Sequence, residues 1–73
     1  MAQEIIEVPI TGKVLSIEVN VGDAVEEGDV ICYVESMKME NPIVAPVAGK
    51  VTEINVEKGQ AVEIGGTIAV IEY

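Results

Sequence analysis

The sequence contains no histidine, arginine, phenylalanine or tryptophan, and its only cysteine is Cys32. A single cysteine cannot form an internal disulfide bond, and in the absence of histidine it cannot contribute to a Cys/His metal site. We therefore expect no bound metal. A free thiol is typical of proteins from a reducing compartment, so the cytoplasm is the expected location.

Long apolar runs and positive charges are also scarce. No run of about 20 apolar residues is available to span a bilayer, and residues 1–8 lack the basic region with which a secretory signal begins. The four lysines face 13 acidic residues, which gives a net charge of −9. Such a charge repels nucleic-acid backbones and anionic lipids, so neither is an expected partner, and its main effect is to keep the protein soluble.

The abundant residues are valine and isoleucine, within a hydrophobic content of 49%. β-Branched side chains are restricted in helices and pack well on a pleated surface, so this composition favours strands. A chain of 73 residues is expected to form one domain, residues 1–73. Because a domain of this size buries only about 60% of its unfolded surface, its core must be economical.

The chain contains two copies of one unit. Residues 9–36 align with residues 46–73 at a constant offset of 37, without a gap. Identical residues occupy 13 of the 28 aligned positions, and in the first copy they are Pro9, Gly12, Lys13, Val14, Ile17, Val19, Gly22, Ala24, Val25, Glu26, Gly28, Ile31 and Glu35. Chance does not explain such agreement, which predicts one structural unit used twice and joined by a hairpin at residues 37–45.

Short strands separated by glycine turns are predicted in both copies. Gly22 and Gly28, like their equivalents in the second copy, lie among acidic or amide neighbours and suit turns in which φ is positive. Between the turns, Leu15, Ile17 and Val19 alternate with polar residues, as in a half-buried strand. Each copy is therefore expected to contribute several short strands.

One segment, residues 29–41, has apolar side chains at helical spacing and contains neither glycine nor proline. Its β-branched content favours a strand, as does Pro42, which disfavours helix at the preceding residue. The predicted fold is all-β: a flattened barrel or sandwich of two antiparallel sheets, with about eight strands and a quasi-twofold internal repeat. The strand Val30–Ser36 would end the first copy, and the chain would reverse at residues 37–39.

Lys38 lies in this reversal, between the only two methionines besides the first residue. It has no counterpart in the second copy, whereas Lys13 and Lys50 are repeat equivalents and are interpreted, with Lys58, as ordinary surface lysines. A tight turn would expose the Lys38 amine to solvent. Flexible, polarizable methionine side chains in such a turn are better suited to being gripped by a second protein than to filling a core.

An exposed lysine can act as a catalyst or as a substrate. Catalysis requires the amine to lose its proton, which costs about 4–5 kcal/mol for an ordinary lysine at pH 7, and Glu35 and Glu40 on either side favour the charged form. Another enzyme must therefore orient and deprotonate the amine, which makes Lys38 better understood as a substrate for acylation. Met37 and Met39 would then form a recognition motif around the nucleophile.

The stretch from Ser36 to Met39 reads Ser-Met-Lys-Met. It resembles the (Ala/Val)-Met-Lys-Met motif of biotinyl domains, the biotin carboxyl carrier modules of biotin-dependent carboxylases and decarboxylases. The resemblance covers nearly the whole chain, including PITGKV at residues 9–14, VGDAVEEGD at 21–29, APVAGKV at 45–51 and KGQAVEIGG at 58–66. Its most specific part is the Met-Lys-Met centred between two repeats, and Ser36 stands where the family more often has alanine.

The resemblance implies a biotinyl/lipoyl-type (hammerhead-like) sandwich in which biotin is joined by an amide bond to Lys38 on a hairpin. It implies attachment by a biotin protein ligase, with recognition residues Glu35, Ser36, Met37, Met39 and Glu40. The resemblance also implies two further partners for the domain, a biotin carboxylase and a carboxyltransferase or decarboxylase. Such a domain moves a carboxyl group between their active sites and catalyses no reaction itself. The gapless repeat has no room for the inserted thumb of acetyl-CoA carboxylase carriers, so the resemblance is closer to propionyl-CoA, pyruvate or oxaloacetate carriers or to a free-standing carrier.

Other functions are compatible with such a scaffold. A lipoyl-type acyl carrier domain shares the sandwich and the hairpin lysine, but lipoyl motifs usually place aspartate before the lysine and alanine or valine after it. An unmodified interaction domain would have no need of Lys38 and both methionines. An independent enzyme is the weakest alternative, because the sequence has no acid–base constellation or phosphate loop, and Cys32, in an apolar run, is better interpreted as a small buried hydrophobe.

Overall fold

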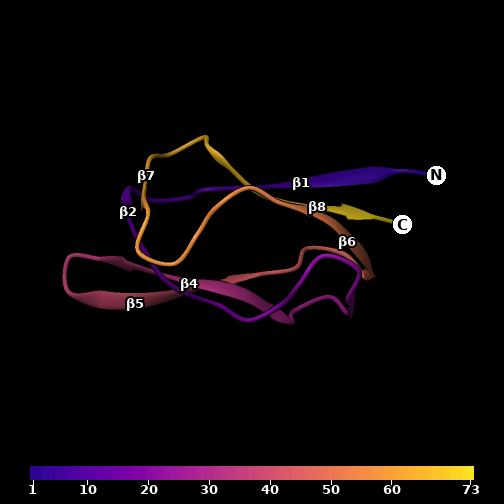
Figure 1. Ribbon diagram of the computed structural model, residues 1–73, viewed down its shortest axis with the longest axis horizontal. Coiled ribbons are helices and arrows are strands. Elements are labelled where there is room, and N and C mark those ends of the chain that lie inside the picture. The colour runs from indigo at the N-terminus through magenta and orange to yellow at the C-terminus, as the bar shows by residue number, and fades with distance from the viewer.

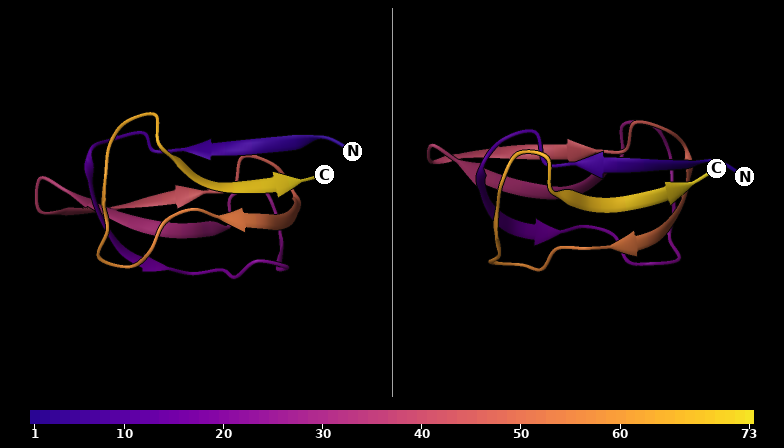
Figure 2. Two further views of the ribbon diagram at one scale, coloured as in Figure 1. Left: turned by 45° about the horizontal axis from the view of Figure 1, so that its top comes forward. Right: turned by 90° about the horizontal axis from the view of Figure 1, so that it is seen from above.

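The computed structural model describes residues 1–73 and contains strands but no helix. The strands are β1 (Gln3–Glu7), β2 (Gly12–Ile17), β3 (Ala24–Val25), β4 (Val30–Ser36), β5 (Met39–Val44), β6 (Gly49–Ile54), β7 (Ala61–Val62) and β8 (Thr67–Glu72). They form two 4-stranded sheets with antiparallel pairing, in the orders β1-β8-β6-β3 and β5-β4-β2-β7 (Figure 1 and Figure 2). The predicted all-β sandwich of two antiparallel sheets is confirmed.

Each sheet combines strands from both copies of the repeat. The offset of 37 residues that aligns the copies relates β1, β2, β3 and β4 to β5, β6, β7 and β8, and it also relates the strand order of one sheet to that of the other. The strands β1 and β5 lie just before the aligned segments and extend each copy at the same offset, so one sheet takes β1 and β3 from the first copy and β6 and β8 from the second. Neither copy therefore contains a complete sheet, and the two must fold together.

The core lies between the sheets and consists of small and β-branched side chains. Among the fully buried residues are the repeat-equivalent pairs Val14 and Val51, Ile31 and Ile68, and Val34 and Ile71. No polar or charged residue is buried. The strand predicted for Val30–Ser36, in the segment that also has helical spacing, is confirmed as β4.

Glycine turns connect the shortest strands to their neighbours. The four turn glycines have φ angles between 87° and 98°, as the sequence predicts, and they are Gly22, Gly28, Gly59 and Gly65. In three of these turns, a backbone N–H donates a hydrogen bond of 2.9 Å to a side-chain oxygen three residues later, and the pairs are Asn20 with Asp23, Glu26 with Asp29 and Glu57 with Gln60. The fourth turn has Gly66 at the acceptor position and therefore lacks this bond.

Gly12 and Gly49 permit a close approach between neighbouring strands. A Cβ atom on Gly12 would overlap the backbone carbonyl oxygen of Glu35, and a Cβ atom on Gly49 would overlap that of Glu72. These glycines begin β2 and β6, so each lets its strand lie directly against β4 or β8. Because Glu35 is near the end of β4, Gly12 helps to fix the backbone just before the chain reverses.

The β4–β5 hairpin projects at one end of the molecule, and both chain termini lie at the other (Figure 1). The molecule measures 36 Å along its longest axis, against 18 and 17 Å along the others. Backbone hydrogen bonds of 2.9 and 2.8 Å between Ala2 and Tyr73 hold the chain ends together. No helix in the structure has the length and apolar character needed to cross a bilayer.

Replacing Gly12 or Gly49 with alanine is expected to lower the free energy of unfolding by about 1–3 kcal/mol, because the strands must separate to admit the methyl group. Gly66→Ala is the matched control, since its Cβ would lie 3.2 Å from the Glu63 carbonyl oxygen and its φ is not left-handed. The control should lose less than about 1 kcal/mol. Urea denaturation measures the difference, and equal losses in Gly12→Ala and Gly66→Ala would contradict the close approach.

Candidate functional site

The chain reverses between β4 and β5 through a two-residue turn made by Met37 and Lys38. The ladder pairs that lead into the turn are Val34 with Asn41, Glu35 with Glu40 and Ser36 with Met39. The structure therefore brings all the site residues predicted from the sequence together in one hairpin. They occupy its last two ladder pairs and its turn.

Met37 and Lys38 have positive φ angles of 54° and 65°, and they are the only non-glycine residues with positive φ. Two successive residues in the left-handed region form a type I′ turn, whose twist matches that of the hairpin strands. Asparagine followed by glycine usually occupies such a turn, because other side chains are strained there by about 1 kcal/mol or more each. Backbone strain confined to one exposed turn is typical of a functional position.

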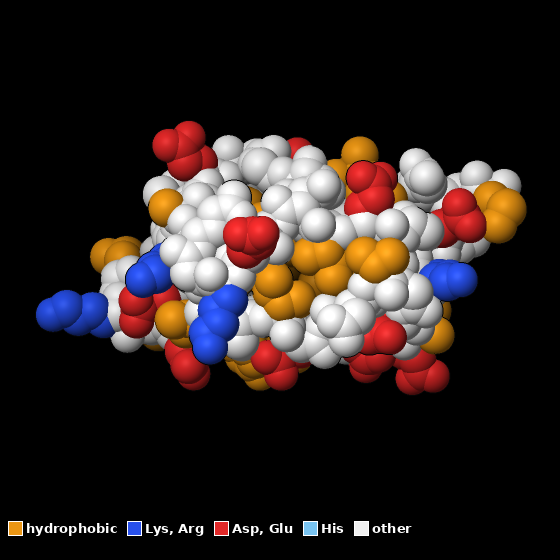
Figure 3. All heavy atoms as spheres, in the orientation of Figure 1, with side chains coloured by type: hydrophobic (Ala, Val, Ile, Leu, Met, Phe, Trp, Pro, Cys, Tyr) orange, Lys and Arg blue, Asp and Glu red, His pale blue; other side chains and the backbone are white.

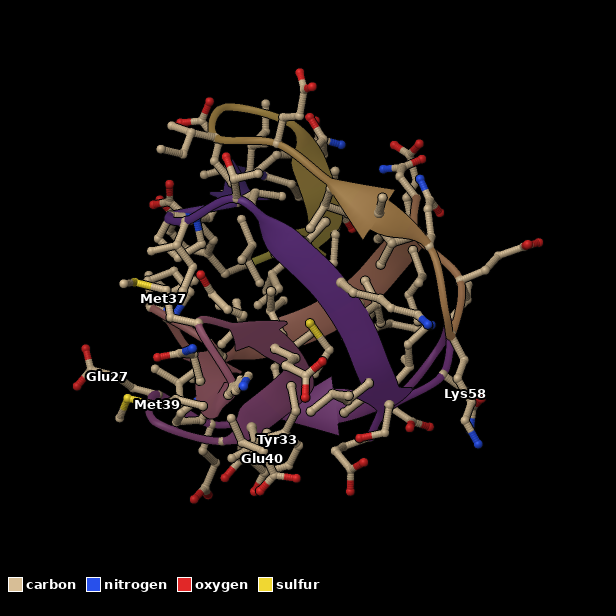
Figure 4. All side chains as sticks on the ribbon, turned by 90° about the vertical axis from the view of Figure 1, so that its left-hand side faces the viewer. Glu27, Tyr33, Met37, Met39, Glu40 and Lys58 are labelled. Atoms are coloured by element: carbon tan, nitrogen blue, oxygen red, sulfur yellow. The ribbon has the colours of Figure 1, made fainter.

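The turn presents the Lys38 side chain to solvent with a methionine on each side of it in the sequence. The side chain of Met37 is 91% exposed and that of Met39 is 66% exposed, and Lys38 is exposed as well. Figure 4, which views the molecule from the hairpin end, shows the two methionine side chains pointing outward at the same edge of the view, Met37 above Met39. Neither methionine contributes to the core, so both are available to a partner.

Asn41 supports the hairpin, although the set of site residues predicted from the sequence omits it. Its side-chain Nδ2 donates hydrogen bonds to the carbonyl oxygens of Met39, at 3.1 Å, and Val34, at 3.3 Å. The bond to Val34 ties β5 to β4 at the third residue beyond the turn, and the bond to Met39 braces β5 itself. An amide two residues after the Met-Lys-Met motif, just before Pro42 and the apolar end of the strand, is the sequence signal that could have identified it.

Glu35 lies between Glu40 on β5 and Lys13 on β2 in the register of its sheet. The second copy repeats the opposite-charge pair as Lys50 with Glu72. Opposite charges on adjacent strands stabilise a sheet by about 0.2–1 kcal/mol. Lys13 and Lys50 thus occupy equivalent places within the sheets, whereas the turn lysine belongs to no ladder pair.

Cys32 is fully buried in β4, and its repeat equivalent, Ala69, is fully buried in β8. Desolvation by burial raises the pKa of the Cys32 thiol from 9.0 to about 11. Because the thiolate is the reactive form of cysteine, this thiol is neither accessible nor ionised at neutral pH. The interpretation of Cys32 as a small buried hydrophobe is confirmed.

The Cys32 thiol is expected to resist an aromatic disulfide reagent in the folded protein and to react fully in denaturant. Its raised pKa means that the stability it contributes is present below pH 9.0 and is lost as the pH rises toward about 11, because the unfolded chain ionises first. Urea unfolding across this pH range should show the loss in the parent chain and a smaller loss in Cys32→Ala, which copies the buried Ala69. Rapid labelling of the folded protein at neutral pH would contradict the burial.

Met37→Asn is expected to raise the free energy of unfolding by about 0.5–1 kcal/mol, because asparagine adopts positive φ with less strain. Met39→Asn is the matched control, since it replaces the other exposed methionine at a position in β5 where φ is not positive. Only the first change should be stabilising in urea denaturation. If the two variants were equally stable, the turn would not be strained at Met37.

Comparisons with known proteins agree with this geometry. Residues 4–71 match the family model described as "Biotin-requiring enzyme". The gamma subunit of glutaconyl-CoA decarboxylase from Acidaminococcus fermentans is 49% identical over 39 residues, which are 53% of this chain and 27% of that subunit. Biotinylated protein TB7.3 from Mycobacterium bovis is 44% identical over 45 residues, which are 62% of each chain.

The structural likeness extends over almost the whole chain. The urea carboxylase of Kluyveromyces lactis matches 99% of it with a TM-score of 0.92 and 36% identity, and the matching part is 6% of that enzyme. The chain therefore spans only part of the length of each of these relatives. The shared fold includes the hairpin that carries Lys38.

Proposed function

The chain belongs to the biotin/lipoyl family as a biotinyl domain, and from that premise we propose that biotin is covalently attached to Lys38. The observation that carries the proposal is the type I′ turn, which places one exposed amine at the tip of a hairpin. The residue fits the cofactor, because an amide bond to biotin requires an accessible primary amine. Biotin, when bound, supplies a ureido group that takes up and releases a carboxyl group.

A biotin protein ligase is the proposed modifying enzyme, and the hairpin is the surface that it would grip. Met37 and Met39 offer exposed, adaptable apolar contacts on both sides of the amine. Ser36 pairs with Met39 directly beneath the turn, and Glu35 pairs with Glu40 one step further from it. Because the turn is held in one conformation, the ligase need not order this segment before it acts, which lowers the entropy lost on binding.

The proposed role of the domain is that of a carrier without catalytic activity. It would move a carboxyl group between a biotin carboxylase site and a carboxyltransferase or decarboxylase site, and the named relatives include components of such enzymes. Tethering to residues 1–73 would raise the effective concentration of the cofactor at both sites. The proposed location is the cytoplasm, where a free thiol such as Cys32 remains reduced.

Co-expression with a biotin protein ligase and free biotin is expected to add one biotinyl group to the chain. Lys38→Arg should abolish the gain, because arginine retains the charge but cannot form the amide. Lys13→Arg and Lys50→Arg, which alter two other exposed lysines, are the matched controls and should keep the gain. Intact-mass measurement of the four chains distinguishes these results.

Absence of a mass gain in the parent chain would contradict biotin attachment, and a gain that persists in Lys38→Arg would contradict the assigned residue. Addition of a lipoyl or octanoyl group instead, in cells that supply both modification systems, would identify a lipoyl-type acyl carrier. No gain from either system would favour an unmodified interaction domain on the same scaffold.

A further inference from the structure

The structure contains one pocket, with a volume of about 580 Å³. It lies between the β1–β2 connection and the segments on both sides of β7, and it is open to solvent. Its walls include the apolar Val8, Val56 and Val62 and the polar Thr11 and Asn55. A volume of this size and a wall that combines apolar surface with a few polar groups are typical of small-molecule sites.

The first copy of the repeat provides an internal comparison, because its equivalent loop has the same turns but encloses no pocket. Ile64 stands where the first copy has Glu27, and Gly66 stands where it has Asp29. The Asp29 side chain accepts a hydrogen bond from its own turn, whereas Gly66 leaves that space empty. Ile64 is 69% exposed. Since the scaffold folds with acidic residues at these positions, the isoleucine and the glycine are not requirements of the fold.

The pocket also lacks the charge that its counterpart carries. In the first copy, five positions equivalent to pocket residues are acidic, namely Glu18, Asp23, Glu26, Glu27 and Asp29. In the pocket, only Glu63 is charged. Acidic side chains are spread over the face seen in Figure 3. On a protein with a net charge of −9, a nearly neutral pocket suits an uncharged ligand that has an apolar part and hydrogen-bonding groups.

The pocket adjoins the base of the hairpin. Gly12 lines the pocket and also lies against the carbonyl oxygen of Glu35, which is three residues before Lys38. Three residues of extended chain span at most about 10 Å, and the roughly ten bonds of a lysine side chain joined to the acyl chain of biotin extend about 12 Å. Figure 2 shows the segments around β7 at the same end of the molecule as the hairpin. A group tethered to Lys38 can therefore reach the edge of the pocket.

We propose that this pocket is a resting site for the bicyclic ring of the biotin carried by Lys38. The ring is uncharged, and its thioether half suits the apolar rim formed by the exposed Ile64 over a floor of the buried Val8, Val56 and Val62. The ureido half has two N–H donors and one carbonyl acceptor, which suit the hydroxyl of Thr11 and the amide of Asn55. The inference rests on the proposed attachment at Lys38.

Amide NMR spectra of the 73-residue chain before and after biotinylation test the inference. Biotinylation is expected to shift the amide signals of Val8, Thr11 and Asn55 as well as those of the hairpin. Nuclear Overhauser contacts are expected between the ring protons of biotin and the methyl groups of Val62. Intact mass measured on the same sample establishes that biotin is attached.

Ile64→Glu restores the residue found in the first copy and is expected to abolish the shifts at Val8 and Thr11 while leaving biotinylation complete. Val21→Glu is the matched control, because it also replaces an exposed aliphatic side chain, 60% exposed against 69%, but lies outside the pocket. The control should keep the shifts. Gly66→Asp copies the turn of Asp29 and places a side chain in the pocket while keeping Ile64. This variant should also abolish the shifts at Val8 and Thr11.

The results expected from these spectra separate the resting site from the attachment. Complete biotinylation with shifts confined to residues 35–41 would overturn the resting site and leave the attachment at Lys38 standing. The resting site would likewise be overturned if Ile64→Glu and Val21→Glu retained identical shifts at Val8 and Thr11. A chain that gains no biotin would overturn the attachment and the resting site together.

Discussion

The pairing of β4 on both of its edges is the constraint on which the site depends. One edge of β4 is bonded to β2 of its own copy and the other to β5 of the second copy, just as β8 is bonded to β6 and β1. Ile31, Cys32 and Val34 anchor β4 in the core. Because successive side chains of a strand point to opposite faces, a shift of β4 by one residue would turn Cys32 and Val34, which are two residues apart, out of the core. Ile31 lies at the bulge just before them. The register, and with it the position of the reversal, is therefore strongly determined.

The fixed register of β4 explains how the turn keeps an unfavourable backbone conformation. Positive φ at Met37 and Lys38 opposes the pairing by an amount of the order of 1 kcal/mol or more for each residue. The chain cannot relieve this strain by sliding, because the ladder pair of Ser36 with Met39 and the bond from Asn41 to Val34 hold the two arms together. The lysine is thus presented in one direction by the backbone, while its own side chain remains free to move.

The sequence predicts features that depend on local chemistry: the two-sheet sandwich, the glycine turns, the strand Val30–Ser36 and the reversal after it. It does not predict which copy supplies each strand of a sheet, because equivalent strands present the same apolar pattern and pairing β1 with β8 joins opposite ends of the chain. The strain at Met37 contradicts local preference, so it becomes visible only when tertiary pairing imposes it. The clamp by Asn41 and the pocket depend on side chains from separate segments, and sequence periodicity carries no information about such contacts.

A resting site on a carrier must be weak if the cofactor is to leave it. A short flexible tether gives an effective concentration in the millimolar range, so a ring with an intrinsic dissociation constant of about 1 mM would be docked about half of the time. Docking for about 90% of the time would weaken capture by a partner enzyme about tenfold, or about 1.4 kcal/mol. An open pocket with few polar groups suits weak docking, in which the ring occupies the pocket for about half of the time. The ring is then shielded for part of the time and is still available to both partners.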